Sequence, residues 1–397
     1  MAGAPPPLDM DRLIDDRRTR IIVCCGSGGV GKTTTAAAIG LRAAERGRHV
    51  VVLTVDPARR LAQSMGLTSL DNTPRLVDGI GNGHADEQSQ PGGPPPGTPQ
   101  QETGGGSLHA MMLDMKRTFD EIVEAHADPD RAAQILANPF YQSLSSSFAG
   151  TQEYMAMEKL GQLRRAEEWD LIVVDTPPSR SALDFLDAPQ RLARFLDGRL
   201  IRLLTAPAKI GGRAYLRVLN AGFGMVTGVL TRILGAQMLR DVQTFVSALD
   251  TMFGGFRERA DYTYQLLRAP GTAFLVVAAP EPDALREASY FVERLATERM
   301  PLAGLLLNRV QRSPAARLSA AGSQAAAETL QVNGAHPLAV AALRRHAERM
   351  QQVSVQRRLA EHFTAAHPVV PVAEVPAQAE DVHDLAGLRA IGQAFGA

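Results

Sequence analysis

The chain has 397 residues, with 42 Lys or Arg and 42 Asp or Glu, so its formal net charge is zero. This balance provides no overall attraction to nucleic acid or anionic lipid, so any such binding would have to be local. The two cysteines, Cys24 and Cys25, are neighbours in an apolar run, which argues against a disulfide framework or a multi-cysteine zinc site. We interpret both as core residues of a reduced, cytoplasmic protein.

The N-terminal segment contains three prolines and four acidic residues and lacks the apolar stretch of a signal peptide. We therefore expect residues 1–19 to be a flexible N-terminus. Short runs rich in Val, Ile and Leu then recur along the chain, and helix-compatible segments separate several of them. Runs without polar alternation favour strands buried on both faces, so the pattern predicts an α/β fold with a doubly wound, mostly parallel sheet. The predicted strands span 20–25, 49–55, 171–175, 273–279, 302–308 and 368–372, with a weaker candidate at 108–114.

Two segments depart from this alternation. Residues 78–107 have almost no apolar content and are expected to be a disordered insertion. A helical pattern covers about 119–165 and 183–267, which we interpret as an inserted helical subdomain. Within it, residues 221–238 are strongly apolar but carry Arg232 and several glycines, so a buried or groove-forming helix is favoured over a membrane span.

The sequence GSGGVGKTT follows the first predicted strand and precedes a helix-forming run. It satisfies the phosphate-loop pattern GxxxxGK[ST], in which glycines let backbone N–H groups point at phosphate oxygens at the start of a helix. Lys32 is expected to reach the β- and γ-phosphates of ATP, and the Thr33 hydroxyl to coordinate Mg²⁺. The predicted ATP-binding residues of the loop are Gly26, Ser27, Gly28, Gly29, Val30, Gly31, Lys32, Thr33 and Thr34.

Two carboxylates stand where predicted strands end. Asp175 closes the strand at 171–175, and Asp56 directly follows the strand at 49–55. Ligands of open parallel sheets gather at this edge. We assign Asp175 to Mg²⁺, through water, and Asp56 to the attacking water as a catalytic residue beside Lys32. The alternative for each is a helix cap with no catalytic role.

Further sequence motifs occur after the phosphate loop and are distributed over most of the chain. They are D-P-A at 56–58, D-T-x-P followed by L-x-F-L-x-x-P within 175–189, APEPDALREASYFVERL at 279–295, and LLLNRV at 305–310. Together with the phosphate loop they resemble the arsenite-pump and tail-anchored-protein-targeting ATPases. These ATPases form part of the deviant Walker A group with MinD, ParA and the nitrogenase iron proteins. The resemblance implies one P-loop ATPase domain of the SIMIBI type over residues 20–397.

The resemblance also implies roles for individual residues. Asp56 would position the attacking water, which agrees with its interpretation above. Asn308 would occupy the base-reading position, and Pro371, within VVPVAEVP at 369–376, would belong to the loop that closes over adenine. The family's subunits face each other across their nucleotides, close on ATP and open after hydrolysis. The helical subdomain would then grip a client or dock on a membrane partner.

The chain departs from the family at several positions. Ser27 stands where the family has a lysine that reaches the partner's phosphates, so a homodimer would lack both of these contacts. Arg60 or a lysine of a different subunit could supply the charge, which leads to the hypothesis of a heterodimer with a related ATPase. The cysteines of the arsenite site and the zinc-binding C-x-x-C pair have no match after position 25.

The leading functional hypothesis is Mg²⁺-dependent ATP hydrolysis that drives a dimer between closed and open states. This cycle would be coupled to handling or targeting of a membrane protein or another client. Alternatives are a regulatory surface ATPase of the ParA and MinD type, an arsenite- or anion-pump subunit, and a weakly hydrolysing half of a heterodimer. We expect no nucleic-acid partner, and a cytoplasmic protein that could be peripheral to the membrane.

Overall fold

The computed structural model describes residues 5–55, 59–80, 105–139, 141–142, 151–177, 258–259, 261–332 and 336–396. The chain divides into two compact units, which we call the sheet unit and the helical unit. The sheet unit comprises Met1–Met112, Glu167–Ala182 and Leu267–Ala397. The helical unit comprises Leu113–Ala166 and Leu183–Leu266.

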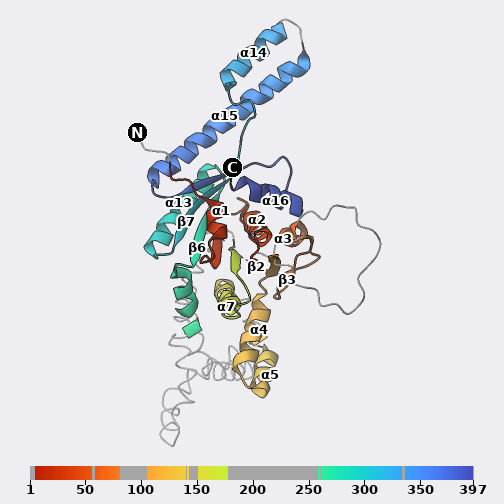
Figure 1. Ribbon diagram of the computed structural model, residues 1–397, viewed down its shortest axis with the longest axis vertical. Coiled ribbons are helices and arrows are strands. Elements are labelled where there is room, and N and C mark those ends of the chain that lie inside the picture. Colours follow the sequence, from red (N-terminus) through yellow and green to blue (C-terminus); the bar gives the residue numbers. More distant parts are fainter. Residues whose placement is uncertain are drawn as a thin grey trace, which may run out of the picture. The chain divides into compact units, whose positions relative to one another are not determined.

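Eight strands form one sheet in the order β3-β4-β2-β5-β1-β6-β7-β8. Figure 1 labels β2, β3, β6 and β7 of this sheet. Neighbouring strands are parallel except for the antiparallel pair β3 and β4. The predicted α/β fold with a mostly parallel sheet is therefore confirmed. The strands are β1 (Ile21–Cys25), β2 (His49–Thr54), β3 (Arg75–Leu76), β4 (Ser107–Met112), β5 (Leu171–Asp175), β6 (Thr272–Ala278), β7 (Leu302–Val310) and β8 (Val372–Pro376).

The last strand differs from its prediction. Residues 368–372 were expected to form it, but β8 spans Val372–Pro376. The apolar run precedes the strand because Pro371 has no N–H to donate to a ladder, and the side chain of Val369 is 84% exposed. The strand predicted at 108–114 is confirmed as β4, which pairs with β2. Residues 81–104 of the predicted insertion lie outside the described residues.

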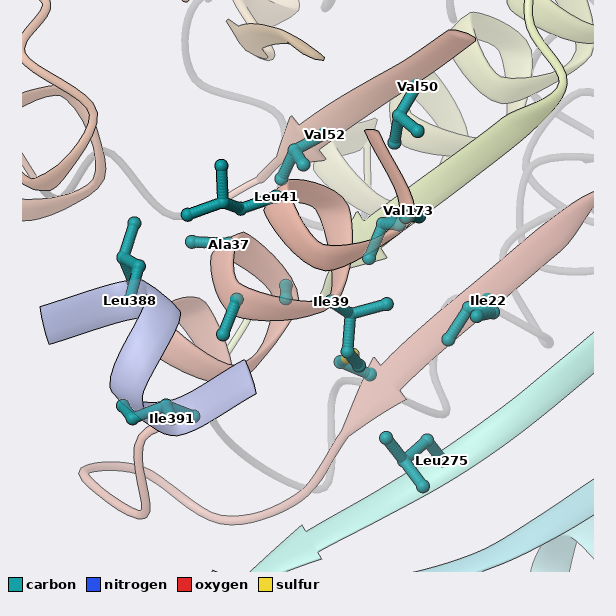
Figure 2. Packing of buried hydrophobic residues seen from close by; sticks show 14 of the residues in the cluster. Ile22, Ala37, Ile39, Leu41, Val50, Val52, Val173, Leu275, Leu388 and Ile391 are labelled. Carbon is teal, nitrogen blue, oxygen red and sulfur yellow. The ribbon is translucent and has the colours of Figure 1, made fainter. Parts of the chain in front are cut away.

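Helix α2 forms the centre of the core of the sheet unit. It begins at Lys32 and ends at Glu45, directly after the phosphate-loop motif. Figure 2 shows Ala37 and Leu41 of this helix among buried side chains of the sheet and of helix α16 (Leu385–Ala394), including Val52 and Leu388. A Cβ atom on Gly40 would lie 2.5 Å from a Val52 methyl carbon, so α2 approaches the sheet more closely than a larger residue allows. This packing fixes the start of α2 relative to the strand ends.

The remaining helices of the sheet unit flank the sheet or extend from it (Figure 1). Helices α14 and α15 pack against each other, and α16 packs against α2. These helices are α1 (Met10–Asp15), α3 (Arg59–Ser64), α13 (Pro282–Thr297), α14 (Ala320–Val332), α15 (Pro337–Ala366) and α16 (Leu385–Ala394).

The N-terminal segment is ordered over residues 5–19, so the prediction of a flexible N-terminus was wrong for them. Met10 and Ile14 of α1 are fully buried, and the Leu8 amide donates a hydrogen bond to the Val372 carbonyl. Asp11 accepts two hydrogen bonds of 2.6 Å from the Arg42 guanidinium of α2. Burial of the two apolar side chains and these charge-assisted bonds outweigh the effect of the prolines and acids.

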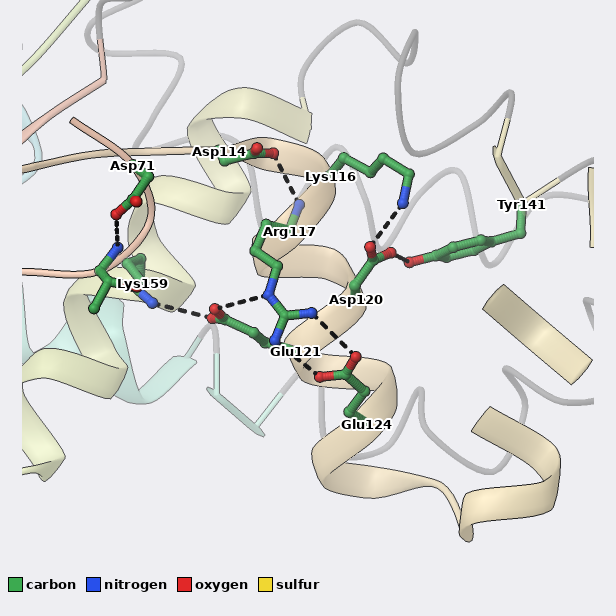
Figure 3. A network of polar contacts seen from close by, with 10 residues as sticks. Asp71, Asp114, Lys116, Arg117, Asp120, Glu121, Glu124, Tyr141 and Lys159 are labelled. Atoms are coloured by element: carbon green, nitrogen blue, oxygen red, sulfur yellow. Dashed lines mark hydrogen bonds and ion pairs between the residues drawn. The ribbon is translucent and has the colours of Figure 1, made fainter. Parts of the chain in front are cut away.

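The described part of the helical unit is held by networks of charged side chains. Its helices are α4 (Met115–His126), α5 (Pro129–Ala137) and α7 (Thr151–Arg165). Lys159 of α7 donates a 3.0 Å hydrogen bond to Glu121 of α4, which also pairs with Arg117 (Figure 3). The nearly buried Glu158 accepts hydrogen bonds from Arg165 and Arg259. These pairs join α4 to α7, and α7 to a residue far along the chain.

Much of the predicted helical subdomain, including residues 221–238, lies outside the described residues. Among the helices that the structure does describe, none combines the length and the hydropathy needed to cross a lipid bilayer.

Candidate functional site

The loop from Gly26 to Thr34 connects the carboxyl end of β1 to the first turn of α2. Gly26, Gly29 and Gly31 have φ angles of 151°, 77° and 94°, which side-chain-bearing residues rarely adopt. A Cβ atom on Gly26 would lie 2.0 Å from the Val277 carbonyl oxygen of β6, so the backbone can pass there only as glycine. Gly31 precedes α2 as its N-cap residue and has no side chain to cap it, so the first amides of this helix are suited to an anion.

Lys32 is the cation of the loop. Its side chain is buried, and its Nζ donates a 2.8 Å hydrogen bond to the Ser27 carbonyl, across the loop that carries both residues. A buried ammonium group beside a glycine-rich loop at the start of a helix is suited to binding a polyphosphate. Ser27, the predicted departure from the family pattern, contributes this carbonyl.

Thr33 and Asp175 meet at the carboxyl edge of the sheet. The Thr33 hydroxyl donates a 2.6 Å hydrogen bond to Oδ2 of Asp175, and Asp175 is fully buried at the end of β5. A hydroxyl and a carboxylate at this separation could hold one small, hard cation together with phosphate oxygens and water, which is the usual way that Mg²⁺ is bound beside a nucleotide. These residues fit a Mg²⁺ ion.

Thr54 is a member of this cluster that sequence reasoning missed. It ends β2, is fully buried, and its hydroxyl donates a 2.9 Å hydrogen bond to the same Oδ2 of Asp175. The only sequence signal was a polar residue at the end of an apolar strand. Its partner could not be read from the sequence because the contact depends on the parallel register of β2 and β5, in which Thr54 lies opposite Asp175.

Asn308 lies against the phosphate loop. Its side chain is 7% exposed, and its Nδ2 donates a 2.8 Å hydrogen bond to the Val30 carbonyl. Its Oδ1 accepts a hydrogen bond of 2.9 Å from the Arg309 amide. The structure therefore brings the residue predicted to read the base to the edge of the loop.

Pro371 lies beside a different part of β7 from Asn308. Its carbonyl accepts a 2.8 Å hydrogen bond from the Leu305 amide, so it lies beside the first half of β7. Asn308 is three residues further along β7 than Leu305, a rise of about 10 Å at the usual 3.3 Å per residue. The part of the last strand in register with Leu307 and Val310 is Glu374–Pro376. Pro371 is thus a poor candidate for contact with the same base as Asn308.

Asp56 and its two following residues lie outside the described residues, and so does the side chain of Arg60. The residue before Asp56, Val55, is buried, and its amide donates a 3.1 Å hydrogen bond to the Asp175 carbonyl. The chain therefore reaches position 56 directly from the strand edge that holds Asp175.

The two cysteines are core residues, as predicted. Cys24 and Cys25 are 0% and 1% exposed. Burial raises the pKa of the Cys25 thiol to about 12 and that of the Cys24 thiol well above its ordinary value. Neither thiol is available as a nucleophile or as a metal ligand in the folded chain.

The sequence profile described as anion-transporting ATPase matches residues 19–320, which includes the loop, Thr54, Asp175 and Asn308. The chain belongs to this family. Since the match covers most of the sheet unit, the P-loop architecture and the enzyme class of ATPase follow from membership of the anion-transporting ATPase family.

Individual members of the family are distant relatives of the chain. ATPase GET3 of Malassezia globosa is 27% identical over 193 residues, which are 49% of this chain and 49% of the relative. ATPase ARSA2 of Chlamydomonas reinhardtii is 23% identical over 325 residues, or 78% of this chain and 73% of the relative. ATPase get3 of Schizosaccharomyces pombe is 23% identical over 314 residues, or 79% and 80%. The chain thus spans about half the length of the first relative and about three quarters or more of the other two.

Proposed function

We propose that the chain binds ATP with Mg²⁺ at the Gly26–Thr34 loop and hydrolyses its terminal phosphoanhydride bond. The observation that supports this most directly is the 2.6 Å contact between the Thr33 hydroxyl and the Asp175 carboxylate, directly beside the anion-binding loop. A carboxylate and a hydroxyl placed together at the end of a glycine-rich loop, where a helix starts, match the requirements of a metal-bound polyphosphate.

Each residue of the chain has a distinct task in this proposal. The loop amides and the start of α2 bind phosphate oxygens, and the Lys32 ammonium exchanges the Ser27 carbonyl for the β- and γ-phosphates. The Thr33 hydroxyl would hold Mg²⁺ directly and Asp175 would hold it through water, while Thr54 fixes the orientation of the carboxylate. The Mg²⁺ ion, when bound, offsets the negative charge of the phosphates.

Asp56 is proposed as the residue that positions the attacking water. Its sequence neighbour Val55 donates a backbone hydrogen bond to Asp175 at this sheet edge, which supports the proposal. We expect Asp56→Asn to bind Mg·ATP like the parent chain but to lose single-turnover hydrolysis, because an amide cannot accept the proton of the water. Unchanged single-turnover hydrolysis would show that Asp56 has been misassigned.

We further propose that the ATPase works as a dimer that closes on ATP and opens after hydrolysis, and that it handles or targets a membrane protein or another client. The family membership and the similarity to proteins named GET3 support this assignment. The cysteines of an arsenite site have no match in the chain, whose two cysteines are buried, so an arsenite pump is disfavoured.

Ser27 favours a heterodimer over a homodimer. It replaces the lysine that would reach the partner's nucleotide, and its short, uncharged side chain cannot supply that charge. Mixing the purified chain with a lysine-bearing paralogue should raise ATP turnover above the sum of the separate rates. The matched control is Ser27→Lys, which should raise the turnover of the chain alone. If neither change raises turnover, the chain works without a lysine in this position, and the heterodimer is wrong.

A further inference from the structure

The Asn308 side chain joins two parts of the proposed nucleotide site that are far apart in sequence. It lies near the carboxyl end of β7, and its Nδ2 donates to the Val30 carbonyl in the phosphate loop at 2.8 Å. Its Oδ1 accepts a hydrogen bond from the backbone amide of Arg309. Arg309 has a left-handed φ of 60°. Because backbone atoms engage both ends of the amide group, its orientation is fixed.

The Val30 carbonyl needs this hydrogen-bond donor. A loop that turns its N–H groups inward, toward a phosphate, must turn carbonyls outward into the protein. Val30 is 3% exposed, so its carbonyl has little access to water, and a buried carbonyl without a partner destabilises the conformation that contains it. Asn308 supplies the donor from a neighbouring element of the sheet unit.

The same amide also fills the space beside Gly31, the residue before the first residue of α2. A Cβ atom on Gly31 would lie 2.4 Å from Nδ2 of Asn308, and Gly31 has a left-handed φ of 94°. The amide and the glycine are therefore complementary in shape. The side chain supports the loop at its turn into the helix, which is the position from which Lys32 and Thr33 project.

We infer that Asn308 is a positioning residue for the phosphate loop, and that it acts on any polyphosphate ligand whether or not a base is present. The inference rests on the proposed function of the loop. It differs from the base-reading role implied by the family resemblance, because a residue that only reads the base matters for nucleotides alone. A positioning residue also matters for a ligand without a base and for the loop without any ligand.

The first test compares Mg·ATP with inorganic tripolyphosphate, which carries the phosphates but no base. Asn308→Ala and Asn308→Asp both remove the donor to Val30, and each should weaken the binding of both ligands by a similar factor, about tenfold. The matched control is Arg309→Asn, which changes the adjacent exposed side chain and keeps a residue that tolerates a left-handed φ. Weaker binding of ATP with unchanged binding of tripolyphosphate would overturn the inference in favour of base reading alone.

The second test needs no ligand. In the nucleotide-free protein, amide hydrogen exchange over Gly26–Thr34 should be faster in Asn308→Ala than in the parent chain and in Arg309→Asn. Exchange over α13 should be the same in all three, which shows that the variant is folded. Unchanged exchange in the loop of Asn308→Ala would overturn the inference.

The two tests also separate this inference from the proposed function. If the parent chain binds neither Mg·ATP nor tripolyphosphate, the proposed function fails, while the exchange measurement still decides whether Asn308 holds the loop. If the parent chain binds both ligands and Asn308→Ala binds both equally well, the function stands and the positioning role is wrong.

Discussion

A positively charged side chain is buried against backbone carbonyls at each of the two edges of the sheet, but the two side chains have different roles. At the amino edge, the Arg48 guanidinium is 1% exposed and donates to the carbonyls of Ile14, Thr19 and Asp170. At the carboxyl edge, the buried Lys32 ammonium donates to Ser27 in its own loop. The carbonyls around Arg48 come from two segments far apart in the sequence, one before β1 and one before β5, whereas the Ser27 carbonyl belongs to the same loop as Lys32.

This difference separates a structural cation from a binding cation. Arg48 ties the segment before β1 to the segment before β5, and burial lowers its pKa to about 10, so it remains protonated near neutral pH. Lys32 can exchange the Ser27 carbonyl, a neutral group of its own loop, for a phosphate oxygen. The comparison predicts that changes at the carboxyl edge remove activity and spare stability, and that changes at the amino edge do the reverse.

The largest effect is expected from Lys32→Ala. Loss of the ammonium should lower ATP turnover by about a thousandfold or more, since the charge acts where negative charge develops during phosphoryl transfer. Steady-state phosphate release measures the loss, and a thermal melt without nucleotide should show a folded protein. A Lys32→Ala turnover within about tenfold of the parent value would contradict the assignment of Lys32 as a binding cation and Arg48 as a structural one.

A smaller effect, on stability, is expected from Arg48→Met. This change keeps the apolar stem and leaves three carbonyls without their donor, which should cost about 3 kcal/mol in the free energy of unfolding. Urea denaturation measures this loss. The control is Arg17→Met, whose side chain is 58% exposed and pairs with Asp170, and which should cost less than about 1 kcal/mol. Equal losses from both variants would mean that Arg48 is no more important than a surface cation.

The smallest effect is expected from Thr54→Val, which keeps the shape of the side chain and removes its hydrogen bond to Asp175. The half-saturating Mg²⁺ concentration for ATP turnover should rise by up to about tenfold, because the carboxylate loses one of the groups that orient it. Thr54→Ser should restore the parent value. An unchanged Mg²⁺ dependence in Thr54→Val would show that the hydrogen bond from Thr54 is not needed to orient Asp175.

The parts of this account that could be predicted from sequence are those with a strong local signal. The apolar runs predicted the buried strands, and the spacing of glycines before Lys32 predicted the phosphate loop at the start of α2. The position of Asp175 followed from its place at the end of a strand. Each of these depends on a few consecutive residues, which is why pattern reasoning suffices.

The remainder depends on contacts between distant segments. Thr54 meets Asp175 through the register of two strands, and Asn308 meets Val30 across most of the length of the chain. The N-terminal helix α1 is ordered by the burial of Met10 and Ile14, which its polar and proline-rich surroundings obscure. The observed bounds of the last strand differ from the predicted ones because a prediction from hydrophobicity alone ignores that Pro371 has no N–H to donate.

The central claim is that the Gly26–Thr34 loop and Asp175 together bind ATP through Mg²⁺. Calorimetric titration of the parent chain and of Asp175→Ala with ATP, each with and without Mg²⁺, tests it most directly. We predict that Mg²⁺ strengthens ATP binding to the parent chain by at least about tenfold and that Asp175→Ala loses this Mg²⁺ effect. A parent chain that does not bind ATP, or an Asp175→Ala variant with the full Mg²⁺ effect, would contradict the claim.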